Sequence, residues 1–156
     1  MPPNFDLYVF VRTADKPAVL ERFIDEYVDE DDPGDPRFAP FVRTFVHERP
    51  DPKDREELSE LCRDEAARSA FSLYLRAKAH DWAIITLTEE ADLVLGLSLD
   101  DSLQTPETEQ EARALLAVLT EGFGALAGIA GVELAPPQSE DEWNEDALVL
   151  MRTGQI

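Results

Sequence analysis

The chain has 156 residues, and its 34 acidic side chains against 14 basic ones give a formal net charge of −20 and a pI near 4.2. Nucleic acids and anionic lipid surfaces are bound through clustered Lys and Arg, so this composition argues against direct binding of nucleic acid or a membrane. The apolar fraction of 44% is too high for a disordered acidic tail and predicts one packed domain.

The start of the sequence predicts a strand followed by a helix. Residues 5–12 alternate between two sides, which is typical of a strand. Asp15 is placed to cap a helix, and Pro17 falls in the first turn, where its missing N–H does no harm. Apolar residues within 20–28 then recur at three- and four-residue spacing, which predicts a helix with one buried face.

The next segment predicts an insert at about 29–69. Residues 29–36 combine acidic side chains with two prolines and a glycine, which indicates a solvated loop. Residues 38–47 fit either a helical stripe or a short strand. A weaker helical stripe, preceded by a capping signal at Asp51, follows and ends near residue 67.

The centre of the chain predicts three consecutive strands, at residues 71–78, 82–88 and 93–99. Each alternates between two sides, and only short turns separate them. Short turns between neighbouring strands predict an antiparallel meander.

The longest predicted helix follows the meander. It begins at Thr105 or, through a competing capping box, at Thr108. Gly128 and Gly131 are the predicted stop signals. Residues 132–134 are predicted to form a last edge strand.

This order of elements predicts an α+β two-layer sandwich, a mainly antiparallel sheet with helices on one face. A ferredoxin-like variant is the alternative. We expect a single domain over 1–156, with the insert described above and a C-terminal extension at about 135–156. Within the extension, Ser139 is predicted to cap a short helix, and 147–151 fits either a helix or a strand.

The sequence carries no clear catalytic, cofactor or metal motif. A calcium loop starting at Asp29 fails because prolines occupy the positions of its middle ligand and its bidentate Glu. His47, Cys62 and His80 lack the spacing of zinc ligands. We expect Cys62 to be an inert thiol on an apolar helix face, and a Cys–His pair stays open. We expect no cofactor and no metal, and we favour a binding protein over an enzyme.

The single cysteine excludes an internal disulfide. Residues 1–6 have neither the basic start nor the apolar run of a signal peptide, and the longest apolar stretches fall short of a membrane span. We therefore expect a cytoplasmic protein.

The charge itself points to a basic protein partner, whose association would be accelerated by electrostatic steering. An acidic inhibitor or immunity protein that neutralises a cationic partner is the leading hypothesis. Adaptation of the whole proteome to its environment explains the charge equally well. The predicted contact residues are the acids of two turns: Asp29, Glu30, Asp31, Asp32, Asp35, Asp100 and Asp101.

Two alternatives stay open. In the first, aromatic and cationic side chains on one sheet face form a patch for an anionic small molecule, in a binding protein or an enzyme. The patch residues are Tyr8, Arg12, Tyr74, Arg76 and Lys78. The same side chains are also consistent with a face covered by the insert, in which Arg and Lys stems pack over the tyrosines. In the second, leucine-rich strand edges or the C-terminal segment mediate a structural homodimer.

Overall fold

The computed structural model describes residues 3–61, 70–101 and 103–156. Its centre is one six-stranded sheet in the order β2-β3-β4-β1-β5-β6. Every neighbouring pair of strands is antiparallel. The strands are β1 (Asn4–Val11), β2 (Phe71–Arg76), β3 (Trp82–Leu87), β4 (Leu93–Asp100), β5 (Ala127–Val132) and β6 (Met151–Gly154).

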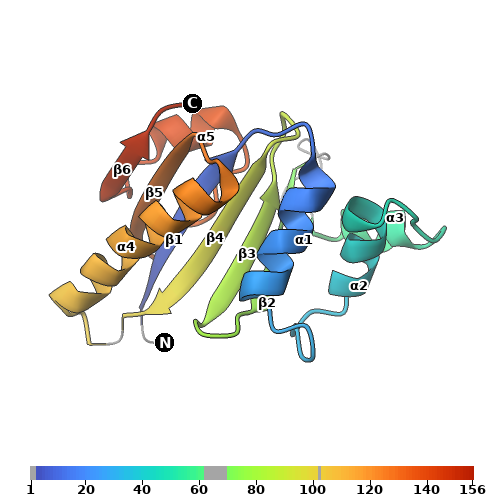
Figure 1. Ribbon diagram of the computed structural model, residues 1–156, viewed down its shortest axis with the longest axis horizontal. Helices are drawn as coiled ribbons and strands as arrows, with labels where there is room; N and C mark the ends of the chain where they lie inside the picture. Colours follow the sequence, from blue (N-terminus) through green and yellow to red (C-terminus); the bar gives the residue numbers. More distant parts are fainter. Residues whose placement is uncertain (1–2, 62–69, 102) are drawn as a thin grey trace.

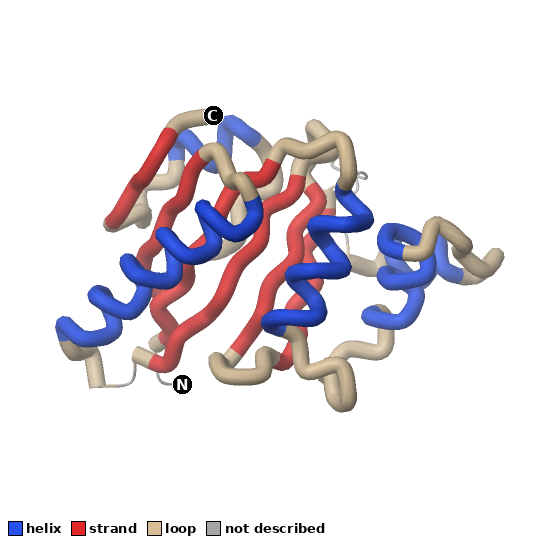
Figure 2. Tube along the Cα trace, viewed as in Figure 1, coloured by secondary structure: helices blue, strands red, loops and turns tan. Residues whose placement is uncertain are grey.

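The helices lie mainly on one side of this sheet. Figure 1 shows α1 and α4 across one face, with α2 and α3 beyond α1, and Figure 2 shows the same layers by type of structure. The described helical segments are α1 (Lys16–Tyr27), α2 (Phe38–Phe41), the π-helical turn η1 (Val42–Val46), α3 (Asp54–Ser59), α4 (Pro106–Phe123) and α5 (Glu140–Glu145). None of the helices in the described part of the chain is long and apolar enough to cross a membrane.

The main core fills the space between the sheet and α1 and α4. Leu7 and Val9 of β1 point to this side and are fully buried, because every second side chain of a strand shares a face. Leu20 and Phe23 of α1 and Leu116 of α4 pack against the same layer. Burying one side chain of this size stabilises the fold by about 1.5–3 kcal/mol.

A second, smaller core lies on the other face of the sheet. There Leu134, just after β5, and Trp143 of α5 lie over the sheet, and the Trp143 ring meets the Phe10 ring edge-on at 5.4 Å between centroids. The cover is partial, because Tyr74 and Trp82 on the same face stay 44% and 39% exposed.

The predicted fold class and the three-stranded meander are confirmed. The ferredoxin-like variant differs from the observed topology. Three antiparallel steps separate β1 from β2, so the strands on either side of α1 run antiparallel, whereas a β-α-β unit joins parallel strands.

Two local predictions are corrected, and one open alternative is resolved. α4 ends at Gly124, whose φ of +63° is a conformation that glycine adopts without strain, while Gly128 and Gly131 lie inside β5. β5 is an inner strand, because β6 pairs with its free edge. Residues 38–47, which fitted helix or strand, are helical as far as Val46. The start of the predicted helix after Asp51 is present as α3, whereas Cys62 and residues 63–69 lie outside the described residues.

Candidate functional site

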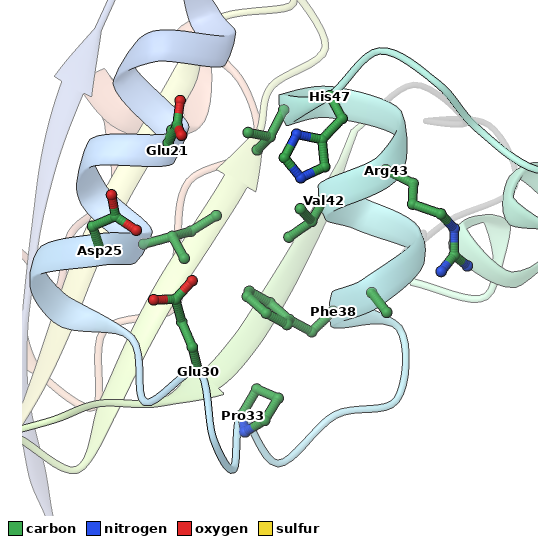
Figure 3. A pocket seen from close by; sticks show the side chains of 11 residues that line it. Glu21, Asp25, Glu30, Pro33, Phe38, Val42, Arg43 and His47 are labelled. Atoms are coloured by element: carbon green, nitrogen blue, oxygen red, sulfur yellow. The ribbon is translucent and has the colours of Figure 1, made fainter.

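A groove opens between α1 and the α2–η1 segment, and Figure 3 shows it from close by. Its volume of about 530 Å³ falls within the range of about 300–1,000 Å³ that is typical of ligand pockets. We call it the acidic groove. The lining side chains that set its charge and polarity are Glu21, Asp25, Glu30, Phe38, Val42 and His47.

α1 supplies one wall of the acidic groove. Asp15 caps the helix by accepting a hydrogen bond from the backbone N–H of Ala18 at 3.3 Å. The buried stripe of α1 faces the sheet, so Glu21 and Asp25, four residues apart, share one exposed flank. Ile24 lies beside them at the base of the groove. The same periodicity that builds the core therefore lines up two carboxylates.

The opposite wall is apolar. Phe38, Val42 and Val46 recur every four residues along α2 and η1 and line the groove together. The chain widens here into a π-helical turn, in which the backbone N–H of His47 donates to the carbonyl of Val42 at 2.9 Å. Such turns occur frequently at functional sites. Figure 3 shows the His47 and Phe38 rings directed toward the space between the walls.

Both walls are anchored to the sheet. The rings of Phe41 and Phe45 lie 6.1 and 5.7 Å from the ring of Phe71 on β2. At the end of α1, Val28 forms an isolated antiparallel bridge with Ala77. The groove is therefore held open by packing on β2 and its continuation.

The charge of the acidic groove is negative. None of the ion pairs within the described residues involves the carboxylates of Glu21, Asp25 or Glu30. Arg43 is turned away in Figure 3, and its guanidinium donates to the Asp54 carboxylate at 2.7 and 3.0 Å. That contact holds the pKa of the Asp54 carboxyl below its usual value. The Arg43 guanidinium, which belongs to the groove lining, is thus already paired with a carboxylate.

The predicted acidic contact loop is only partly available. Asp32 is bonded to the Arg76 guanidinium, and Asp35 accepts from the Arg37 guanidinium at 2.9 and 3.0 Å, which lowers the pKa of Asp35. Asp29 accepts from the backbone N–H of Asp32 at 3.3 Å.

Glu30 and Asp31 are the exposed acids of this loop that join no ion pair within the described part of the chain. Of the two, Glu30 lines the groove, and Figure 3 shows its carboxylate directed toward the space between the walls. The loop thus adds one acid to those of α1.

The structure places Asp100 and Asp101 away from this loop. Asp100 ends β4, opposite Asn4 of β1, and β3 lies between β4 and β2, the strand that contacts the loop. Asp101 is 6% exposed, and its backbone N–H donates to the carbonyl of Pro3 at 3.0 Å. The seven predicted contact acids therefore do not form one surface.

Of the residues in the predicted aromatic patch, Tyr8 and Tyr74 lie on the same sheet face. The strands that carry them are not neighbours, but the pairing Tyr8–Gly96–Ile84–Tyr74 runs straight across the sheet. A Cβ on Gly96 would come within 2.3 Å of the Tyr8 ring, so this ring lies directly over the glycine. Tyr8 is fully buried, and its hydroxyl donates to the carbonyl of Leu134.

The predicted cations of this patch are engaged elsewhere. Arg12 is bonded to Asp92 and Glu140 at the far end of β1. The Lys78 ammonium donates to the backbone carbonyl of Asp25, at the end of α1. Arg76 has its partner in the acidic loop. The structure therefore does not assemble a cationic patch for an anion.

A pocket of about 320 Å³ lies between the two tyrosines instead. We call it the aromatic pocket. Its lining includes Asn4, Asp6, Tyr8, Tyr74, Trp82, Ser98 and the 133–135 segment. Asp6 is 6% exposed and accepts a hydrogen bond from the Ser98 hydroxyl. Burial, reinforced by the charge of Glu133, raises the pKa of Asp6 to about 6.

Sequence reasoning named Glu30, Tyr8 and Tyr74, but it missed the other lining residues of both sites. Glu21 and Asp25 looked like ordinary solvated positions on an amphipathic helix, and only the neighbouring segment turns them into a wall. Asp6 did carry a signal, because an acid among the aromatic and β-branched residues of a strand that reads as buried is unusual.

Within residues 3–61, 70–101 and 103–156, no three His, Cys, Asp or Glu side chains are grouped so as to hold a metal ion. Comparison of the chain with protein-family models, with curated proteins and with solved structures found no match.

Proposed function

We propose that this protein is an acidic binding protein whose acidic groove takes up a basic amphipathic segment of a partner protein. The observation that carries the proposal is an apolar wall facing the carboxylates of Glu21, Asp25 and Glu30, which join no ion pair among the described residues. Apolar side chains of the partner would contact Phe38 and Val42, and its Lys or Arg side chains would meet the carboxylates.

Helical segments are recognised in grooves by apolar anchors at three- and four-residue spacing. The four-residue spacing of Phe38, Val42 and Val46 offers a matching row of contacts. The net charge of −20 favours approach of a cationic segment over an anionic one and accelerates the encounter at low salt. An inhibitor or immunity protein is the class in which this chemistry is useful, because covering a cationic surface blocks its contact with an anionic target.

The test uses a labelled helical peptide with leucines at three- and four-residue spacing and lysines between them, titrated in fluorescence anisotropy. A double variant, Glu21→Gln with Glu30→Gln, removes two charges from the groove. The control, Glu111→Gln with Glu121→Gln, removes two charges from exposed positions on α4. We expect the groove variant to bind roughly tenfold more weakly, which corresponds to about 1.4 kcal/mol, and the control to bind nearly as well as the natural chain.

Val42→Ser in the apolar wall should weaken the same peptide without changing the net charge. Equal losses in the two Glu→Gln variants would show that only bulk charge matters and would overturn the proposal. Light scattering that shows a dimer broken up by Val42→Ser would also overturn it, because a second copy would then occupy the groove. If the groove variant alone loses binding, partners that the natural chain retains from a lysate and the variant does not become candidates.

A further inference from the structure

The aromatic pocket lies on the face of the sheet opposite α1 and α4, outside the acidic groove. β1, β2, β3 and β4 each contribute lining residues, and the segment after β5 closes one side. It contains no residue of the groove, so its chemistry is independent of the function proposed above.

Aromatic rings form much of its wall. Tyr74 and Trp82 keep 44% and 39% of their surface exposed, although both sit on a sheet whose other face is packed. They occupy adjacent strands on the same face, since Tyr74 pairs with Ile84 and Trp82 lies two residues before it. The buried Tyr8 ring, lying over Gly96, completes the aromatic lining. The pocket therefore offers a ligand two exposed aromatic rings, which a merely acidic surface patch would not provide.

Two carboxylates lie in the same pocket. Asp6 projects from β1 and is held by the Ser98 hydroxyl and by a backbone hydrogen bond from Leu134. Glu133 follows β5 and accepts from the backbone N–H of Asn4 at 2.9 Å. The charge of Glu133 acts on Asp6 electrostatically, and the burial of Asp6 leaves its charge poorly solvated.

The pocket lining includes no Lys, Arg or His. The nearest basic side chain along the same row of the sheet is Arg76, which pairs with Trp82 on β3 and is bonded to Asp32 of the acidic loop. Asn4 is also committed, since its side-chain amide donates to Asp81 at 2.8 Å and to the carbonyl of Leu99 at 3.2 Å. The negative charge of the pocket is therefore not balanced from within it.

We propose that the aromatic pocket binds a small organic ammonium ion, with the rings of Tyr74 and Trp82 against the cation and the carboxylates of Asp6 and Glu133 balancing its charge. The faces of tryptophan and tyrosine rings attract ammonium groups, and the attraction grows when the group is desolvated. A volume of about 320 Å³ is at the lower end of the ligand-pocket range and suits a short alkyl amine or one lysine side chain.

The test follows the indole N–H signals in 15N NMR spectra while n-butylammonium chloride is added. The chain has two tryptophans, and Trp82→Leu identifies which signal belongs to the pocket. The neutral analogue n-butanol and sodium chloride at equal ionic strength are the ligand controls. We expect only butylammonium to shift the Trp82 signal saturably, with a dissociation constant on the order of millimolar, as befits a ligand of so few atoms.

Three variants make the proposal falsifiable. Tyr74→Leu and Trp82→Leu, at partly exposed positions, should weaken butylammonium binding about threefold to fivefold, followed in the Trp82 variant by ligand-observed NMR. Asp6→Asn should weaken binding by about tenfold. The spectra themselves show whether each variant is folded. The double variant Glu21→Gln with Glu30→Gln should bind butylammonium as tightly as the natural chain does. Trp82→Leu should likewise bind the groove peptide as tightly as the natural chain does. These two controls allow the proposal for one site to be refuted independently of the proposal for the other.

A glycine-flanked single-lysine peptide distinguishes the two sources of the ammonium group. Binding of this peptide at least as tightly as butylammonium would indicate a lysine side chain of a protein, and weaker binding a free amine; both support an ammonium site. Equal shifts with butanol, shifts that never saturate, or full binding by Asp6→Asn would each overturn it.

Discussion

Replacing Asp6 with asparagine should make this protein more stable at neutral pH. Burial of the Asp6 carboxyl, together with the charge of Glu133, outweighs the hydrogen bonds that it accepts and raises its pKa from 3.8 to about 6. The folded state therefore holds this proton more tightly than the unfolded state. The stability that the group contributes is complete below about pH 3.8 and is lost as the pH rises through about 6.

The size of the effect follows from the two pKa values. A rise from 3.8 to about 6, at about 1.36 kcal/mol per pH unit, corresponds to up to about 3 kcal/mol of unfolding free energy at pH 7.5. Asparagine is never charged, and its side-chain oxygen can still accept from the Ser98 hydroxyl. It does not replace the charge-assisted bond from the backbone of Leu134 in full, so the gain should fall somewhat below that limit.

Urea unfolding of the natural chain and of Asp6→Asn, between about pH 4 and about pH 7.5, measures this difference. We expect it to be small at the acid end, to grow between about pH 3.8 and about pH 6, and to level off above that. Asp31→Asn is the matched control, because it removes the same charge from an exposed position in the acidic loop. A difference for Asp6→Asn that does not change with pH, or that equals the control at every pH, would refute the electrostatic reasoning.

Two further predictions test a packing contact on the sheet and an ion pair within the insert. Gly96→Ala should lower the unfolding free energy by about 1–3 kcal/mol in urea titrations, because the added methyl group would displace the Tyr8 ring; no loss would mean that the ring does not lie over Gly96. Arg43→Met should lower the melting temperature at pH 7 by leaving the Asp54 carboxylate without its cation. Since the pKa of Asp54 is lowered in the fold, this loss should disappear as the pH falls below that pKa, and a loss that persists there would contradict the ion pair as its cause.

The elements of this fold were predictable where the signal is local. Alternation in β1 and the three- and four-residue spacing of α1 depend on neighbours along the chain, and both elements are present within a residue or two of the predicted limits. The end of α4 was misjudged because Gly124, Gly128 and Gly131 all resemble stop signals in sequence. Only strand pairing with β1 shows that the last two belong to a strand.

The candidate sites were less predictable, because they depend on contacts between distant segments. Alternation alone placed Tyr8 and Tyr74 on consistent sides of their strands, but the intervening β3 and β4 could not be inferred from it. The sequence also does not show which acidic side chains already form ion pairs within the protein. Asp32 meets Arg76 across 44 positions of sequence, and without that contact it looks identical to Asp31.

The net negative charge of the surface acts at longer range than the contacts within the two pockets. This difference in range determines which of these features can discriminate between ligands. Exposed charges are largely screened beyond about 8 Å at physiological salt, so the carboxylates of the surface attract every cation alike. Selection needs groups that respond to the shape and hydration of the cation, and the apolar wall of the groove and the rings of the aromatic pocket supply them. The buried Asp6 carboxylate lowers the unfolding free energy at neutral pH, a loss of stability that an uncharged amide at this position would avoid. A cation seated against the rings would favour the ionised form and recover that free energy. Proton and ammonium ion would then compete for one carboxyl, so a saturating amine should stabilise the fold more at pH 7.5 than near pH 4.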